Sequence, residues 1–234
     1  MLGLVEQWPR GRLLDIGAGS GALAAGLQQL GFAVSACDLF PDQFQARGIP
    51  FTVANASESL PYPPASFDAV TCLETIEHLE DQFRFARECA RVLAPGGHVY
   101  LSTAPYLSFA GAHLPRLKLQ VPLHLLVGRR AAFSTFRFLA RHAPWTLKEP
   151  ANENSFIKAA RRGEIKDDDL LEKVRVARLR GQIAAAGLRI VREELHVTST
   201  VRRLPAGVAR WLRDSPLTQD ALISNMEYVL ARRF

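Results

Sequence analysis

The stretch Leu13-Leu14-Asp15-Ile16-Gly17-Ala18-Gly19-Ser20-Gly21 decides the fold of this chain. The apolar residues 13–16 predict a buried parallel strand that carries one acidic side chain. The three alternating glycines predict a tight turn, because glycine adopts backbone angles that other residues avoid and has no Cβ to hold a ligand away. Residues 22–30 then predict a helix that ends at Gly31. Strand, glycine turn and helix together favour a nucleotide-like ligand at the helix N-terminus.

Two aspartates near this turn carry further information about the ligand. Read loosely, residues 17–22 also fit a dinucleotide fingerprint, so the turn alone is a weak signal. Asp15 lies inside the predicted strand, where a carboxylate needs a partner that a ligand ammonium or loop amides could supply. Asp38 ends the next predicted strand, residues 33–37, where a carboxylate can accept both hydroxyls of a ribose. A structural turn with no ligand is the alternative interpretation.

The pattern from Asp15 to Gly21, with Asp38 downstream, resembles motif I and the acidic residue of the class I methyltransferases that use S-adenosylmethionine. Residues 60–68, 77–79 and 91–97 resemble the small-molecule branch of this family, which includes the quinone O-methyltransferases. The resemblance covers residues 12–105. It resumes at residues 183–195, which are similar to the family's late helix and sixth strand, and at residues 225–233, which are similar to its seventh strand.

The resemblance implies an α/β, Rossmann-like, doubly wound sheet of seven mostly parallel strands, with an antiparallel last strand. Residues 1–234 would then form a single methyltransferase domain, with residues 105–180 as an α-helical lid and acceptor-binding insertion. The cofactor would be S-adenosyl-L-methionine. The residues implied to bind it are Asp15, Gly17, Ala18, Gly19, Gly21, Asp38, Leu39, Asn55, Ala56 and Leu73. Asn55 stands where the family usually has Asp, but its amide oxygen can still accept from the adenine amine.

The segment Glu74-Thr75-Ile76-Glu77-His78 holds the candidate catalytic residues. On one helical turn, two carboxylates and an imidazole at this spacing would share a face and could bind a divalent ion. The segment resembles metal-assisted methyltransferases that have a further His, but Lys173 stands in its place and has no lone pair to donate. We therefore predict no metal and assign catalytic roles to His78 and Glu77. A polar helix start without chemistry is the alternative.

Composition and cysteine usage limit the class of protein. A chain of 234 residues with 48% hydrophobic residues is ordinary for a globular domain. Cys37, Cys72 and Cys89 are odd in number and lie in predicted core elements, so we expect reduced thiols and a cytoplasmic protein. We find neither a signal peptide nor an apolar stretch of membrane-spanning length.

The charge of the chain is unevenly distributed. Residues 1–115 carry a net charge of −5, whereas residues 116–213 carry +12. Within the basic stretch, residues 131–142 predict a helix in which Phe133 and Phe136 accompany Arg137 and Arg141. A basic amphipathic helix of this kind is compatible with contact to an anionic membrane surface through residues 129–141. The interpretation that we favour is that the phenylalanines pack onto the protein while the arginines face water. We expect no nucleic-acid partner, because no recognisable RNA-binding module accompanies the charge.

The predicted function is methyl transfer from S-adenosylmethionine to a small-molecule acceptor, with oxygen as the favoured atom, by in-line displacement. Two alternatives from other classes remain. A non-catalytic protein could keep the fold and bind S-adenosylmethionine without transfer. A nicotinamide-dependent oxidoreductase is disfavoured by Asp15 and would show a spectral change with a nicotinamide cofactor.

Overall fold

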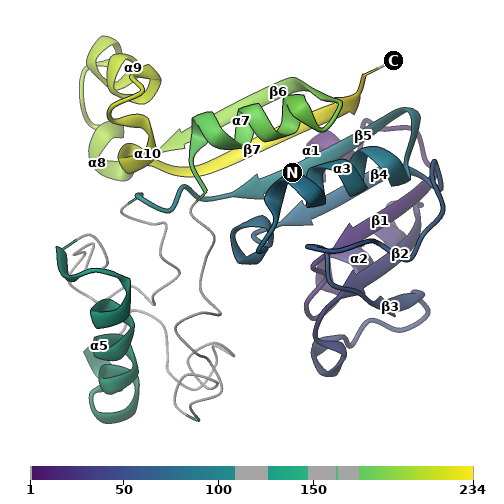
Figure 1. Ribbon diagram of the computed structural model, residues 1–234, viewed down its shortest axis with the longest axis horizontal. Coiled ribbons are helices and arrows are strands. Elements are labelled where there is room, and N and C mark those ends of the chain that lie inside the picture. Colours follow the sequence, from purple (N-terminus) through teal and green to yellow (C-terminus); the bar gives the residue numbers. More distant parts are fainter. Residues whose placement is uncertain (1, 109–125, 147–161, 163–173, 234) are drawn as a thin grey trace. The chain divides into compact units, whose positions relative to one another are not determined.

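The computed structural model describes residues 2–108, 126–146, 162 and 174–233 (Figure 1). The strands are β1 (Arg12–Ile16), β2 (Ala33–Asp38), β3 (Phe51–Val53), β4 (Phe67–Leu73), β5 (Leu93–Thr103), β6 (Leu188–Val197) and β7 (Ile223–Arg232). The α-helices are α1 (Leu2–Val5), α2 (Ala22–Gln29), α3 (Gln82–Val92), α5 (Arg129–His142), α7 (Val176–Ala185), α8 (Ser199–Arg202), α9 (Ala206–Asp214) and α10 (Gln219–Leu222). Short 3-10 helices are η1 (Pro41–Gln43), η2 (Ile76–His78) and η3 (Pro144–Thr146).

The seven strands form one sheet in the order β3-β2-β1-β4-β5-β7-β6. β1 pairs in parallel with both β2 and β4, and β4 pairs in parallel with β5. β7 runs antiparallel to β5, with Ser102 opposite Glu227. This confirms the predicted mostly parallel sheet with an antiparallel last strand. The chain adds β2 and β3 on one side of β1 and then adds β4 and β5 on the other side. The strand order therefore reverses between β1 and β4, and a ligand crevice is expected at the carboxyl ends of these two strands.

Apolar side chains on one face of the sheet hold α1 and α2. Leu27 of α2 and Val5 of α1 belong to the same buried cluster as Leu13 of β1 and Val34 of β2. Leu13 and Val34 are partners in the β1–β2 register, so they lie on the same face of the sheet. The cluster anchors α2 directly after the glycine turn, which fixes the helix N-terminus beside the carboxyl end of β1.

Helices α3 and α7 pack against each other in front of the strands (Figure 1). Asp81 caps α3 by accepting a hydrogen bond from the Arg84 amide at 2.8 Å, which satisfies one of the free N–H groups of the first turn. α3 ends at Val92, and β5 begins at Leu93. The β4–β5 register shifts between Phe67 and Ala69, whose partners are Leu93 and His98, so residues 94–97 form an irregularity within the strand.

The chain divides into two compact units. The first consists of Met1–Thr103, Val176–Leu195 and Met226–Phe234, and the second of Ala104–Arg175 and His196–Asn225. In the second unit, the predicted helix at 131–142 is confirmed as α5, and Phe133 and Phe136 are buried. Their burial supports the interpretation that these phenylalanines pack inside the protein. The sequence reasoning did not predict α8, α9 and α10.

Candidate cofactor and active site

Asp38 joins the glycine turn to the end of β2. Its Oδ2 accepts a hydrogen bond from the Gly19 amide at 2.8 Å, and its Oδ1 accepts one from the Phe40 amide at 3.0 Å. The amides of Gly17 and Ala18 both donate to the Cys37 carbonyl oxygen, at 2.9 and 3.1 Å. The two loops that follow β1 and β2 are therefore tied together. This geometry places the predicted ribose acceptor, Asp38, directly beside the glycine turn.

The three glycines of the turn have different surroundings. All three have positive φ angles, of 73° at Gly17, 51° at Gly19 and 79° at Gly21. A Cβ at Gly17 would lie 2.1 Å from Thr75 Oγ1, and one at Gly21 would lie 2.6 Å from the Ala46 side chain. A Cβ at Gly19 would meet nothing within 4 Å. Packing thus requires two of the glycines, while Gly19 leaves an open approach to the backbone, as a cofactor cradle needs.

Asp15 lies in the core of the sheet with one carboxylate oxygen unpaired. Its Oδ1 accepts a hydrogen bond from Thr71 Oγ1 at 2.7 Å, whereas the buried Oδ2 has no partner among the described residues. Burial raises the pKa of Asp15 from 3.8 to about 7; the Thr71 hydrogen bond lowers it and the charge of Asp38 raises it further. A buried oxygen without a donor fits a ligand that carries an ammonium group, as the amino-acid part of S-adenosylmethionine does.

The candidate adenine-binding residues already have partners within the protein. Asn55 Oδ1 accepts from the Ser57 amide at 3.0 Å, and its Nδ2 donates to Glu58 Oε1 at 3.2 Å. Ala56 is buried, Leu39 is exposed and Leu73 is half-buried. An amide oxygen has a second lone pair, so contact between Asn55 and adenine is compatible with this turn and remains a prediction.

The segment from Glu74 to His78 differs from the predicted helical turn. Glu74 has a φ of 46°, lies before the 3-10 helix η2, and accepts a hydrogen bond from the Ser102 hydroxyl. Glu77 is buried, and its Oε2 accepts from Thr103 Oγ1 at 2.8 Å, whereas His78 is exposed. The prediction that these three side chains share one face was wrong, because the backbone here is not α-helical. Lys173 lies outside the described residues.

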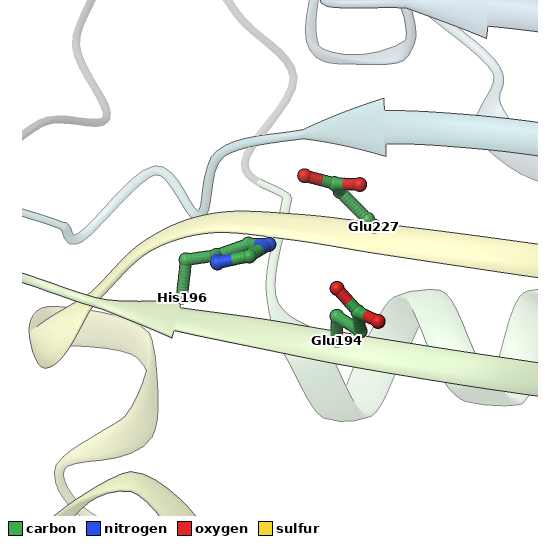
Figure 2. A group of neighbouring side chains, drawn as sticks. All are labelled: Glu194, His196 and Glu227. Atoms are coloured by element: carbon green, nitrogen blue, oxygen red, sulfur yellow. The ribbon is translucent and has the colours of Figure 1, made fainter. Parts of the chain in front are cut away.

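A second group of possible ligands lies on β6 and β7, and the sequence reasoning missed it. Glu194, His196 and Glu227 have ligand atoms within 4.8 Å of one another (Figure 2). Glu194 Oε1 accepts from Arg192 Nε at 2.7 Å, and Glu227 accepts from the Tyr100 hydroxyl. The signal in the sequence was the spacing of two between Glu194 and His196, which puts them on one face of a strand. Both carboxylates already serve protein donors, so we assign no metal to them.

The three cysteines are buried and free. Burial raises the pKa of the Cys37 thiol to about 12, and it raises the pKa values of Cys72 and Cys89 as well. Thiols that are protonated at neutral pH are weak nucleophiles. The cysteines therefore act as apolar core residues, in line with their expected place in core elements.

Comparisons with known proteins match the first part of the chain. Residues 14–101 match the family described as "Methyltransferase domain". The ubiquinone biosynthesis O-methyltransferase of Xanthomonas campestris pv. campestris strain B100 is 36% identical over 104 residues, which are 41% of this chain and 44% of that protein. The protein of the same name from Xanthomonas oryzae pv. oryzae strain PXO99A is 37% identical over 101 residues, or 39% of this chain and 42% of that protein. The match therefore spans less than half the length of these curated relatives.

Solved structures resemble almost the whole chain at low sequence identity. An S-adenosylmethionine-dependent methyltransferase from Mesorhizobium loti has a TM-score of 0.60 and 18% identity, over 99% of this chain and 96% of that chain. One from Methanosarcina mazei has a TM-score of 0.59 and 17% identity, over 100% of this chain and 97% of that chain. Among the described residues, no helix has the length and apolar character needed to cross a membrane.

The likeness to these structures shows the fold, and the matched family covers the glycine turn, Asp38 and the strands around them. Asp15 and Gly19 present the unpaired oxygen and the open backbone that suit the cofactor of such proteins. Residues 14–101 of the chain therefore match a methyltransferase domain, and the chain as a whole has the fold of the S-adenosylmethionine-dependent methyltransferases to which it is similar.

Proposed function

We propose that the protein transfers the methyl group of S-adenosylmethionine to an oxygen atom of a small-molecule acceptor. The observation that carries this proposal is the glycine turn, in which Asp38 binds the Gly19 amide beside the unpaired Oδ2 of Asp15. The preference for oxygen and for a small acceptor is supported by the ubiquinone biosynthesis O-methyltransferases, to one of which the chain is 36% identical over 104 residues.

When bound, S-adenosylmethionine supplies a methyl group made reactive by a sulfonium. Asp38 would accept hydrogen bonds from the ribose hydroxyls, and Asp15 would face the ammonium group. The cofactor would supply a methyl carbon to the acceptor oxygen and would itself leave as its demethylated product, while a base or water would take the proton of the acceptor. Because the reaction is an in-line displacement, alignment of the acceptor oxygen supplies most of the acceleration.

His78 is our candidate for the base. It is exposed at the end of η2, directly after β4, whereas Glu77 is buried and accepts a hydrogen bond from Thr103. A buried carboxylate that already accepts a hydrogen bond is better suited to holding the η2 backbone in place than to taking a proton. We therefore propose a proton-accepting role for His78 and a positioning role for Glu77. Residues 105–180 remain our proposed lid and acceptor-binding insertion.

Calorimetry and a transfer assay together test the proposal. We expect the protein to bind both S-adenosylmethionine and its demethylated product. We also expect that product to accumulate when phenols and catechols of increasing apolar character are supplied as acceptors. Absence of binding would remove the whole proposal. Binding without transfer to any acceptor would favour a non-catalytic protein, and a spectral change with a nicotinamide cofactor would favour an oxidoreductase.

A further inference from the structure

Helix α9 exposes an apolar face. No residue of α9 is buried, and Val208 and Trp211 are 46% and 66% exposed. These two residues are three apart, so they lie on the same side of the helix. Leu204, just before α9, is 40% exposed, and Leu217, just after it, is 94% exposed. Four large apolar side chains are thus exposed within 14 residues, and exposed apolar surface beside polar residues is typical of an interaction site.

Arginines lie on the other side of α9 and in the residues just before it. Residues 199–217 contain Arg202, Arg203, Arg210 and Arg213, and Asp214 is their one acidic residue. Arg213 Nε donates to Asp214 Oδ1 at 2.7 Å, so this acid is already paired with an arginine of the same helix. Arg210 and Arg213 are three apart and project from a different side of α9 than Val208 and Trp211. The segment is thus apolar on one side and strongly basic on the other.

We propose that residues 199–217 bind an anionic membrane surface, with α9 lying in the plane of the interface. A short helix with tryptophan and aliphatic side chains on one side and arginines on the other suits the boundary between headgroups and acyl chains. Trp211 and Val208 would enter that boundary, and the arginines would reach phosphate groups. This inference concerns a different segment from residues 129–141, and it does not depend on the proposed methyl transfer.

The charge and the apolar side chains of residues 199–217 favour an anionic membrane over two other partners, a second copy of the chain and an RNA. A second copy of the chain, related by two-fold symmetry, would bring the same arginines together across the interface, and like charges repel. An RNA partner would satisfy the arginines but would leave aliphatic Val208, Leu204 and Leu217 without an apolar partner. An anionic membrane satisfies both sides of α9 at once.

Vesicle sedimentation tests the proposal with matched variants. We expect binding to phosphatidylcholine vesicles to rise as phosphatidylglycerol is added and to fall with salt. A basic residue near an anionic surface is worth roughly fivefold in partitioning, so Arg203→Gln with Arg210→Gln should weaken binding about 25-fold. Val208→Ser with Trp211→Ser should also weaken it, by more than roughly tenfold. Because all four side chains are exposed, circular dichroism should show an unchanged fold.

The control removes the same charge elsewhere. Arg137→Gln with Arg141→Gln changes two exposed arginines of α5 and should leave vesicle binding within about twofold of the parent protein. If the α5 pair abolishes binding and the α9 pair does not, the contact lies at residues 129–141 and our proposal is wrong. Equal recovery in the supernatant at every lipid composition also overturns it.

Fluorescence locates Trp211 directly. In a protein with Trp8→Phe and Trp145→Phe, the remaining Trp211 should be quenched by brominated lipids in anionic vesicles. Absence of quenching would contradict the proposal. Sedimentation velocity without lipid tests whether two copies of the chain associate. A dimer that Trp211→Ser converts to a monomer would assign the apolar face of α9 to self-association instead. RNA binding that needs Arg203 and Arg210, with no quenching by lipid, would assign it to nucleic acid.

Discussion

At the scale of single residues, Asp38 holds the glycine turn and is the proposed ribose acceptor. Its carboxylate accepts the Gly19 and Phe40 amides and, in our proposal, the ribose hydroxyls. Loss of a charged hydrogen-bond acceptor typically costs about 1.5 to 3 kcal/mol. We therefore expect Asp38→Ala to weaken binding of S-adenosylmethionine by roughly tenfold to a hundredfold in calorimetry.

Asp42 provides a matched control for this measurement. It is an exposed acid four residues later, in η1, with no role in the turn. Asp42→Ala removes the same charge and should leave affinity within about twofold of the parent protein. Equal losses in the two variants would mean that general charge, and not the contacts of Asp38, governs binding.

Asp15 should make stability depend on pH. Its pKa is about 7 in the folded protein and 3.8 when unperturbed, with burial as the main cause. The folded protein therefore keeps this proton to higher pH than the unfolded chain does. The free energy of unfolding should fall as pH rises between these two pKa values, by on the order of 4 kcal/mol, and then level off.

Urea unfolding of the parent protein and of Asp15→Asn checks this sign. The variant cannot ionise, so its stability relative to the parent should increase as pH rises from about 4 to about 7. Ionisable groups that both proteins share contribute equally to the two free energies of unfolding, so they cancel in the difference. Parallel stability curves across this range would show that the carboxyl titrates normally.

At the scale of elements, substitutions at different glycines of the turn should affect protein stability and cofactor affinity differently. Gly17→Ala places a Cβ against Thr75 at a positive φ and should destabilise the protein by about 2 to 5 kcal/mol. Gly19→Ala meets open space, so its cost to stability should be only the left-handed strain of about 1 to 2 kcal/mol. The new methyl group would nevertheless block the approach to the backbone. Cofactor affinity should therefore fall at least tenfold.

Gly26→Ala in α2 is the control for these glycine variants. Gly26 lies in a helix, and a Cβ there would also meet nothing within 4 Å. Alanine should stabilise the helix by up to about 1 kcal/mol and leave affinity unchanged. Thermal unfolding and calorimetry on the three variants give both quantities. Unchanged affinity in Gly19→Ala would place the cofactor away from this turn.

At the scale of the whole molecule, we expect methyl transfer to survive a strong chelator. Glu74, Glu77 and His78 do not share one face, and Glu77 accepts a hydrogen bond from Thr103 in the core. Assays with and without chelator decide this once an acceptor is identified. Loss of activity that magnesium or manganese restores would contradict the prediction.

In that event, two variants would locate the metal. His78→Ala would abolish restoration if the ion lies beside η2. His196→Ala would abolish it if the ion lies among Glu194, His196 and Glu227 on β6 and β7. Each variant serves as the control for the other, because both remove one exposed imidazole.

The sequence alone was sufficient for the local elements around the glycine turn. β1, α2 and β2 begin and end within about one residue of their predicted bounds, because a buried apolar run and the glycines encode them locally. The family resemblance supplied the mostly parallel sheet of seven strands and its antiparallel last strand, which no local pattern encodes. Asp15 and Asp38 could be singled out from the sequence because one lies within a predicted strand and the other at the end of one.

Tertiary structure decided what depends on residues distant in the sequence. The spacing of Glu74, Glu77 and His78 suggested one face of a helix, but hydrogen bonds from Ser102 and Thr103 of β5 hold the two glutamates in a different backbone conformation. Similarly, the β5–β7 register brings Glu227 to Tyr100, across 127 positions of the sequence. Periodicity reports which side chains of one element share a face, whereas pairing between elements decides which of them meet.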